Sequence, residues 1–337
     1  MGPTFSGFLI SAMVFLTQLL SLTDGRDIGV CYGLNGNNLP SPGDVINLYK
    51  TSGINNIRLY QPYPEVLEAA RGSGISLSMS TTNEDIQSLA TDQSAADAWV
   101  NTNIVPYKED VQFRFIIIGN EAIPGQSSSY IPGAMNNIMN SLASFGLGTT
   151  KVTTVVPMNA LSTSYPPSDG AFGSDITSIM TSIMAILAVQ DSPLLINVYP
   201  YFAYASDPTH ISLDYALFTS TAPVVVDQGL EYYNLFDGMV DAFNAALDKI
   251  GFGQITLIVA ETGWPTAGNE PYTSVANAQT YNKNLLNHVT QKGTPKRPEY
   301  IMPTFFFEMF NEDLKQPTVE QNFGFFFPNM NPVYPFW

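Results

Sequence analysis

Two stretches of this sequence share one pattern, a run of mostly apolar residues that leads into a glutamate. Residues 113–118 are followed by Gly-Asn and then Glu121, and residues 256–260 are followed directly by Glu261. Neither run alternates regularly between apolar and polar residues, which is typical of strands buried on both faces of a parallel sheet. A carboxylate at the end of a buried strand is costly without a partner. Both glutamates are therefore candidate functional residues.

The same kind of strand recurs along the chain and alternates with helical segments. Eight strands are predicted, at 28–32, 56–60, 75–80, 113–118, 151–156, 194–199, 256–260 and 300–307. Helices are predicted at 42–51, 64–71, 84–90, 95–107, 130–145, 175–188, 235–250 and 274–291. A small insertion between the sixth and seventh strands contains a further strand at 224–227. Eight β–α repeats over about 300 residues are typical of a (β/α)8 TIM barrel.

We therefore predict one α/β barrel domain over residues 26–337. A doubly wound open sheet is the alternative, but its first β–α turn is expected to carry Gly-X-Gly-X-X-Gly, which is missing here. In a barrel of parallel strands, catalytic residues lie at the carboxyl ends of the strands. Glu121 follows the fourth strand and Glu261 the seventh, so the two carboxylates are expected to face one cleft. Glycosidic bond cleavage uses such a pair, one as proton donor and one as nucleophile or base.

Aromatic and amide side chains follow several of the same strands. The aromatic candidates for stacking on sugar rings or binding their hydroxyls are Tyr60, Tyr199, Tyr201, Phe202 and Trp264. Asn120, beside Glu121, is a candidate for binding a substrate 2-hydroxyl. Farther on, Lys315 is expected to lie near Glu312 and keep it ionised. The alternative for Glu312 and Lys315 is an ordinary surface pair three residues apart.

Composition excludes several other functions. The net charge is −16 without a cluster of Lys or Arg, which disfavours binding to nucleic acid or to anionic membranes. One cysteine and two histidines make a zinc site improbable, and we expect no metal and no cofactor. Because Cys31 lies inside the first strand, we predict a buried structural thiol. Glu121 and Glu261 therefore remain the main catalytic candidates.

The amino terminus has the pattern of a secretory signal. Residues 8–22 are largely apolar, a run that is short for a membrane span and typical of a signal-peptide core. Small residues precede Arg26, so we predict a cleaved signal peptide at 1–25 and a secreted product. The alternative is an amino-terminal helix in an intracellular protein. We expect no membrane anchor, because no later segment is apolar for long enough.

Seven motifs occur in an order that resembles the plant endo-β-1,3-glucanases of glycoside hydrolase family 17. They are the segments 28–33, 57–60, 118–121, 194–202, 234–237, 259–265 and 309–315. The resemblance implies Glu121 as acid/base, Glu261 as nucleophile and retention of anomeric configuration. It also implies auxiliary cleft roles for Glu312 and Lys315, a β-glucan substrate and a monomer. The expected location is the apoplast or cell wall, with a role in plant defence or in callose turnover.

Two alternatives to this function stay open at the level of sequence. The first is a mixed-linkage β-1,3;1,4-glucanase of the same fold, and the second is a glucan-binding protein without activity. The chain also departs from the family pattern at Glu308, where a small residue is usual. An additional anion at this point is expected to raise the pKa of a neighbouring acid.

Overall fold

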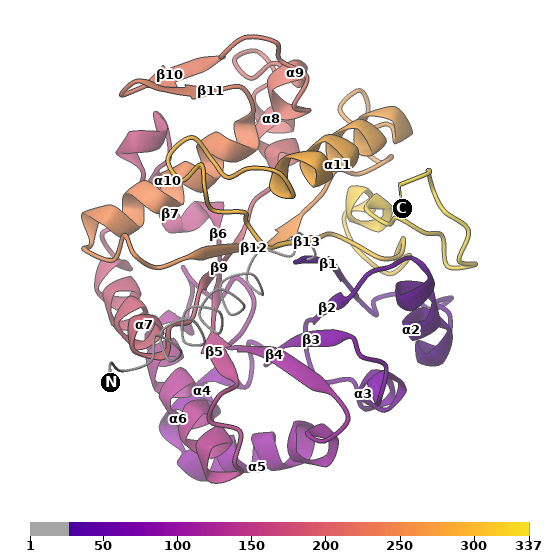
Figure 1. The fold of residues 1–337 in the computed structure, drawn as a ribbon, viewed down its shortest axis with the longest axis vertical. Helices are drawn as coiled ribbons and strands as arrows, with labels where there is room; N and C mark the ends of the chain where they lie inside the picture. The colour runs from indigo at the N-terminus through magenta and orange to yellow at the C-terminus, as the bar shows by residue number, and fades with distance from the viewer. Residues whose placement is uncertain (1–26, 337) are drawn as a thin grey trace, which may run out of the picture.

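The computed structural model describes residues 27–336, so the predicted signal peptide at 1–25 lies outside the described residues. Its centre is a parallel sheet with the strand order β5-β4-β3-β2-β1-β13-β12-β9-β6 (Figure 1). The strands are β1 (Ile28–Cys31), β2 (Asn56–Leu59), β3 (Ser76–Ser80), β4 (Gln112–Ile117), β5 (Lys151–Thr153), β6 (Val155–Pro157), β9 (Leu194–Asn197), β12 (Leu257–Thr262) and β13 (Thr304–Phe306).

The two ends of this strand order are the two halves of one predicted strand. Only Thr154 separates β5 from β6. The first half pairs with β4 and the second half pairs with β9 on the other side. The sheet therefore closes into a barrel through residues 151–157, and the predicted eight-stranded (β/α)8 barrel in a single domain is confirmed. The break was not predicted, because residues 152–156 are all β-branched.

Helices surround the barrel, as Figure 1 shows. They are α2 (Pro42–Thr51), α3 (Pro64–Ala70), α4 (Ile86–Thr91), α5 (Gln93–Asn103), α6 (Ile131–Ser144), α7 (Thr177–Gln190), α8 (Pro200–Ser206), α9 (Leu213–Ala216), α10 (Leu235–Lys249) and α11 (Val275–Val289). Side-chain caps fix several of their starts. Ser41 accepts a hydrogen bond from the Asp44 backbone N–H, and Asn234 and Ser274 cap α10 and α11 in the same way. The eight predicted helices are found with ends shifted by up to four residues.

Two small hairpins lie outside the barrel sheet. β7 (Leu161–Thr163) pairs with β8 (Ala171–Phe172), and β10 (Val225–Asp227) pairs with β11 (Leu230–Tyr232). The second hairpin lies between β9 and β12 and belongs to the predicted insertion. Its turn has positive φ at Gln228 and Gly229, 50° and 83°, as a two-residue hairpin turn prefers. β7, β8 and β11 were missed because strands of two or three residues carry too little periodicity.

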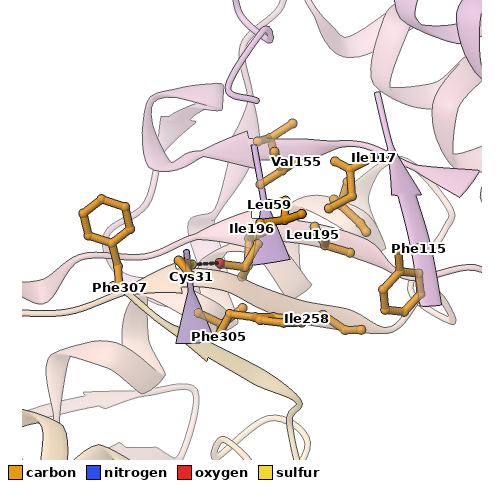
Figure 2. Packing of buried hydrophobic residues seen from close by; sticks show 14 of the residues in the cluster. Cys31, Leu59, Phe115, Ile117, Val155, Leu195, Ile196, Ile258, Phe305 and Phe307 are labelled. Carbon is orange, nitrogen blue, oxygen red and sulfur yellow. Dashed lines mark hydrogen bonds between the residues drawn. The ribbon is translucent and has the colours of Figure 1, made fainter. Parts of the chain in front are cut away.

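A continuous apolar core fills the space around the barrel strands. Figure 2 shows part of it, contributed by strands from both halves of the chain. Cys31 belongs to this core: its side chain is fully buried and its Sγ donates to the Ala260 carbonyl oxygen at 3.3 Å. Burial raises the pKa of the thiol to about 12, so the predicted structural thiol is confirmed. Within residues 27–336, no helix is long and apolar enough to cross a membrane.

Candidate active site

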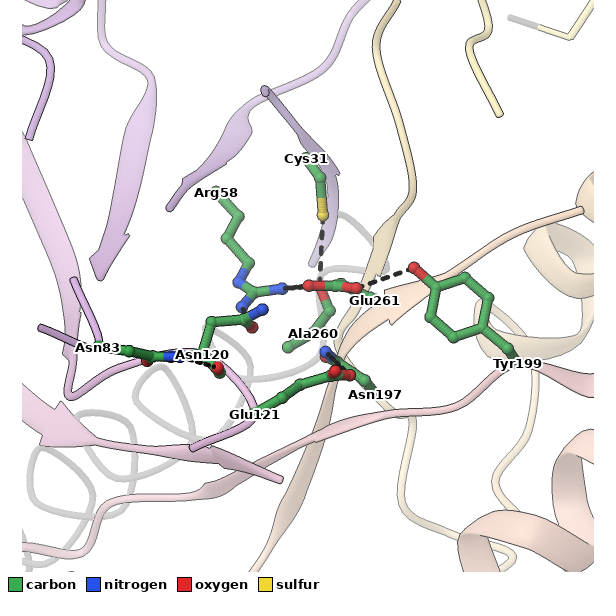
Figure 3. Close-up of polar contacts among 9 residues, drawn as sticks. All are labelled: Cys31, Arg58, Asn83, Asn120, Glu121, Asn197, Tyr199, Ala260 and Glu261. Carbon is green, nitrogen blue, oxygen red and sulfur yellow. Dashed lines mark hydrogen bonds and ion pairs between the residues drawn. The ribbon is translucent and has the colours of Figure 1, made fainter. Parts of the chain in front are cut away.

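Glu261 lies at the carboxyl end of β12, and both of its carboxylate oxygens have partners. Oε1 accepts from Arg58 Nη1 at 2.6 Å, and Oε2 accepts from the Tyr199 hydroxyl at 2.8 Å (Figure 3). The register of β12 against β9 shifts between Val259 and Glu261. A bulge of this kind re-aims the side chain beside it. Glu261 is therefore held by both of its oxygens and lines a cavity at the mouth of the barrel.

Arg58 is the cation that offsets the energetic cost of burying the Glu261 carboxylate. Its side chain is fully buried on β2, where Nη1 also donates to the Ala260 carbonyl oxygen at 3.0 Å and Nη2 donates to Asn120 Oδ1 at 2.6 Å. Its guanidinium carbon lies 4.7 Å from the centre of the Tyr60 ring. The sequence analysis did not select Arg58. A charged residue inside the short buried run of β2 was the signal available for finding it.

Glu121 lies on a turn that follows β4, and the backbone of this turn is unusual. Both Gly119 and Glu121 have positive φ, 68° and 52°, which is uncommon for a residue other than glycine. The Asn83 side chain holds the peptide between them. Its Oδ1 accepts from the Asn120 N–H at 2.8 Å, and its Nδ2 donates to the Asn120 carbonyl oxygen at 2.9 Å. A Cβ at Gly119 would approach Asn83 Oδ1 to 2.7 Å, so this contact requires glycine.

The environment of Glu121 differs from that of Glu261. Glu121 is exposed and lines a cavity, yet its carboxyl group is partly buried. This partial burial is the largest cause of a raised pKa, and the negative charge of Glu261 adds to it. Asn197 Nδ2 donates to Glu121 Oε1 at 2.8 Å and opposes the rise. One carboxyl group is thus favoured in its protonated form, while the other is paired with a cation.

Two cavities meet at Glu261. One, of about 580 Å³, is lined by both Glu121 and Glu261, as well as by Asn197, Tyr199, Phe202 and Phe307. The other, of about 460 Å³, shares Glu261 and Phe307 with the first and is also lined by Tyr60, Asn120, Glu312 and Lys315. Figure 3 shows Glu121 with Asn197 beside it, and Glu261 between Arg58 and Tyr199. Residues from distant parts of the chain therefore form one continuous groove.

Most of the predicted substrate-binding residues lie on this groove. Six of them line one of its two cavities, namely Tyr60, Asn120, Tyr199, Phe202, Glu312 and Lys315. Phe202 is 41% exposed, and its ring centre lies 5.2 Å from that of Tyr199. Phe307 and Glu320 were not selected from the sequence. Phe307 follows two core aromatics, and Glu320 belongs to a 3-10 turn (Thr318–Asn322) that the sequence pattern did not connect with the cleft.

The predictions for Trp264 and Tyr201 were wrong. Trp264 is fully buried, so it offers no face on which a sugar can stack, and Tyr201 is 1% exposed. The alternation of β12 explains the first error. Thr262 and Trp264 both contact Tyr281 of α11, on the side away from the groove, whereas Glu261 points into it. Tyr201 packs edge-on against Trp264, with 5.3 Å between the two ring centres.

Glu312 and Lys315 are an ion pair in the cleft and not a surface pair. Lys315 Nζ lies 2.9 Å from Glu312 Oε2, and the two side chains are 16% and 1% exposed. Burial lowers the pKa of Lys315, but the carboxylates of Glu308 and Glu312 outweigh it, so the net shift is upward. Among residues 27–336 no group of three or more His, Cys, Asp or Glu side chains is arranged to hold a metal ion.

The sequence profile of glycosyl hydrolases family 17 matches residues 28–336, nearly the whole chain. The chain belongs to this family. The predicted family is thereby confirmed, and the seven motifs that suggested it lie within the matched range.

Named relatives of this family 17 chain cover almost all of it. A glucan endo-1,3-beta-glucosidase of Vitis vinifera is 45% identical over 334 residues, covering 97% of this chain and 96% of the relative. Lichenase-2 of Hordeum vulgare is 42% identical over 310 residues, covering 92% and 98%. The solved structure of CJP38, a beta-1,3-glucanase and allergen of Cryptomeria japonica pollen, is 43% identical with a TM-score of 0.88, covering 92% and 98%.

Proposed function

We propose that this family 17 protein hydrolyses internal β-1,3-glucosidic bonds of β-glucans. The observation that carries the proposal is the pair of glutamates in one cavity, one beside a cation and the other with a raised pKa. Glu261 has a cation on one oxygen and a hydroxyl donor on the other. Glu121 has a raised pKa and an open path to the cavity. A glycosidase needs one ionised and one protonated carboxyl group at the same bond.

The proposed mechanism is double displacement with retention. Glu261 attacks the anomeric carbon and forms a glycosyl ester, while Glu121 gives its proton to the leaving oxygen. Water then enters; Glu121 takes a proton from it, the new C–O bond forms at the anomeric carbon and the ester bond to Glu261 breaks. Burial raises the pKa of Tyr199 well above its usual value, and the Glu261 carboxylate adds to the rise. Its hydroxyl therefore keeps its proton and orients the nucleophile.

The shape of the groove supports cleavage inside a long chain. Glu261 and Phe307 line both cavities, so space extends on either side of the nucleophile. A third cavity of about 680 Å³ shares Met158, Ala203 and Met239 with the one that contains Glu121. An exo-acting enzyme needs only one end of the chain, whereas this groove continues past the reacting bond in both directions. Secretion to the apoplast or cell wall, a defence role and a monomeric state stay predictions.

The alternative substrate is a mixed-linkage β-1,3;1,4-glucan. The relative named Lichenase-2 supports it, because its name refers to a different glucan and it is nearly as similar to this chain as the glucosidase of Vitis vinifera. The groove is lined by aromatic and amide side chains, which fit the hydroxyls and apolar faces of either polymer.

The test is the release of reducing ends from soluble laminarin and from mixed-linkage cereal glucan, with Glu261→Gln as the matched inactive control. We expect laminarin to yield short oligosaccharides of several lengths from the earliest times. Preference for cereal glucan would favour the alternative substrate. No release above the control from either polymer would refute hydrolysis, and release of glucose alone would refute internal cleavage.

The raised pKa of Glu121 predicts a specific pH dependence. The proton donor is lost as pH rises through this pKa, so the alkaline limb of kcat/KM is expected above the range of an ordinary glutamate. Asn197 lowers this pKa through its hydrogen bond. Asn197→Ala is therefore expected to shift the alkaline limb to higher pH, as measured by a pH profile of laminarin hydrolysis. A shift to lower pH, or none, would contradict the assignment of this limb to Glu121.

A further inference from the structure

Glu308 is a fully buried carboxylic acid that the mechanism above does not use. It lies two residues past the end of β13, and its Oε1 lies 2.5 Å from Lys315 Nζ. Its Oε2 is buried and has no hydrogen-bond partner among the described residues. Glu308 also lies close enough to Glu261 for the two charges to interact. Placing another acid beside a catalytic carboxylate is costly, so its position invites a functional explanation.

Lys315 connects Glu308 to the groove. Its ammonium lies between Glu308 Oε1 and Glu312 Oε2, at 2.5 and 2.9 Å, and 4.4 Å from the centre of the Phe307 ring. The side chain is 16% exposed and lines the cavity that also contains Tyr60 and Asn120. An ammonium group has three N–H donors. One of them is donated to Glu308 Oε1, and the Glu312 carboxylate lies beside the ammonium without a hydrogen bond, so a donor is left for a ligand in this cavity.

Glu312 alone does not fix the direction of that donor. Its carboxylate packs against Gly33, where a Cβ would approach Glu312 Oε1 to 2.4 Å, but its contact with Lys315 lacks hydrogen-bond geometry. The contact with Glu308 is a hydrogen bond. Two anchors on different sides define the orientation of an ammonium group, whereas a single ion pair leaves it free to rotate. Glu308 therefore supplies the second anchor.

We propose that Glu308 is a positioning residue, which orients Lys315 so that one ammonium N–H points at the hydroxyls of a glucosyl unit beside Glu261. The inference rests on the proposed function, since it names a contributor to glucan binding in the same groove. Burial raises the pKa of Glu308 well above its usual value, and Lys315 opposes the rise. Either protonation state keeps an oxygen that can accept from Lys315. The role therefore depends on the contact and not on the charge of Glu308.

The test is a double-mutant cycle on a short β-1,3-gluco-oligosaccharide, made from Glu308→Ala, Lys315→Met and the double variant. Glu308→Ala is expected to raise KM roughly tenfold, the effect of losing one charge-assisted hydrogen bond, with kcat changed much less. In the Lys315→Met background, Glu308→Ala is expected to have no further effect on KM. Glu308→Gln keeps an acceptor oxygen and is expected to restore most of the affinity.

Two controls separate positioning from simple destabilisation. Glu68→Gln removes a carboxylate from an exposed ion pair with Arg71, and it is expected to leave KM unchanged. Thermal unfolding identifies any variant that does not fold. If Glu308→Ala does not fold, the KM of Glu308→Gln decides: a value near that of the unaltered protein supports the role, and a roughly tenfold rise contradicts it. Unchanged KM in Glu308→Ala, or equal effects of that change with and without Lys315, would overturn the proposal.

A binding measurement separates the test of the positioning role from the test of hydrolysis. The same cycle is repeated by calorimetry in the Glu261→Gln background, where the oligosaccharide binds without turnover. If the unaltered protein releases no reducing ends, hydrolysis is refuted, whereas the dissociation constants still decide the positioning role. We expect the loss of affinity caused by Glu308→Ala to depend on Lys315 here too, and its absence would contradict the proposal.

Discussion

Glu261→Gln is expected to lower the turnover of laminarin by on the order of 10⁴-fold or more, while the barrel stays folded. An amide of the same shape keeps the hydrogen bond from Tyr199 but cannot form the glycosyl ester. The measurement is reducing-end release at substrate saturation, with circular dichroism as the check on folding. A variant that retained most of its activity would refute the assignment of Glu261 as nucleophile.

The same substitution also has a predicted cost in stability. Arg58 is fully buried, and in the variant its charge loses the only carboxylate with which it forms an ion pair among the described residues. Removing one partner of a buried pair typically costs about 3–5 kcal/mol. We expect less here, because Asn120 Oδ1 and the Ala260 carbonyl oxygen still accept from the guanidinium. Glu68→Gln, in an exposed pair, is the matched control and is expected to change the free energy of unfolding little.

Glu121→Gln is expected to slow laminarin hydrolysis by roughly 10²–10⁴-fold, the usual contribution of general acid–base catalysis. The loss should be much smaller for glycosyl-enzyme formation from an aryl β-glucoside, because a good leaving group departs without a proton. The measurement is the pre-steady-state burst of phenol from an activated substrate, compared with laminarin turnover.

Glu320→Gln provides a control for this comparison. Glu320 lines the same cavity as Glu121, but it belongs to a 3-10 turn in the carboxyl-terminal part of the chain. Its substitution is expected to affect both substrates alike. If Glu121→Gln also slowed the two substrates equally, Glu121 would not be the proton donor to the leaving group.

The barrel and its two glutamates could be predicted because they follow from local pattern. Residues 113–118 and 256–260 are recognisable as buried strands, and parallel strands in a barrel share one carboxyl end. The side-chain direction beyond a strand end is less predictable. Trp264 was misplaced because alternation past Glu261 turns its side chain away from the groove, toward Tyr281 of α11.

Other site features depend on contacts between distant segments. Asn83 holds the turn that carries Glu121 from 37 residues away, and Arg58 reaches Glu261 across 203 residues. Arg58 had a usable signal, because a charge in a buried strand needs a partner. Asn83 had none, since an asparagine in a loop is ordinary. The role of Glu308 likewise became apparent only when the structure placed Lys315 between it and Glu312.

The central claim is that Glu121 and Glu261 act on one glucosidic bond through a covalent intermediate. The most direct test is proton NMR of the anomeric signals during the first minutes of laminarin hydrolysis, before mutarotation mixes the anomers. The account predicts that the β-anomer of the new reducing end appears first and the α-anomer follows slowly. An α-anomer that appears first would show inversion and would contradict the account.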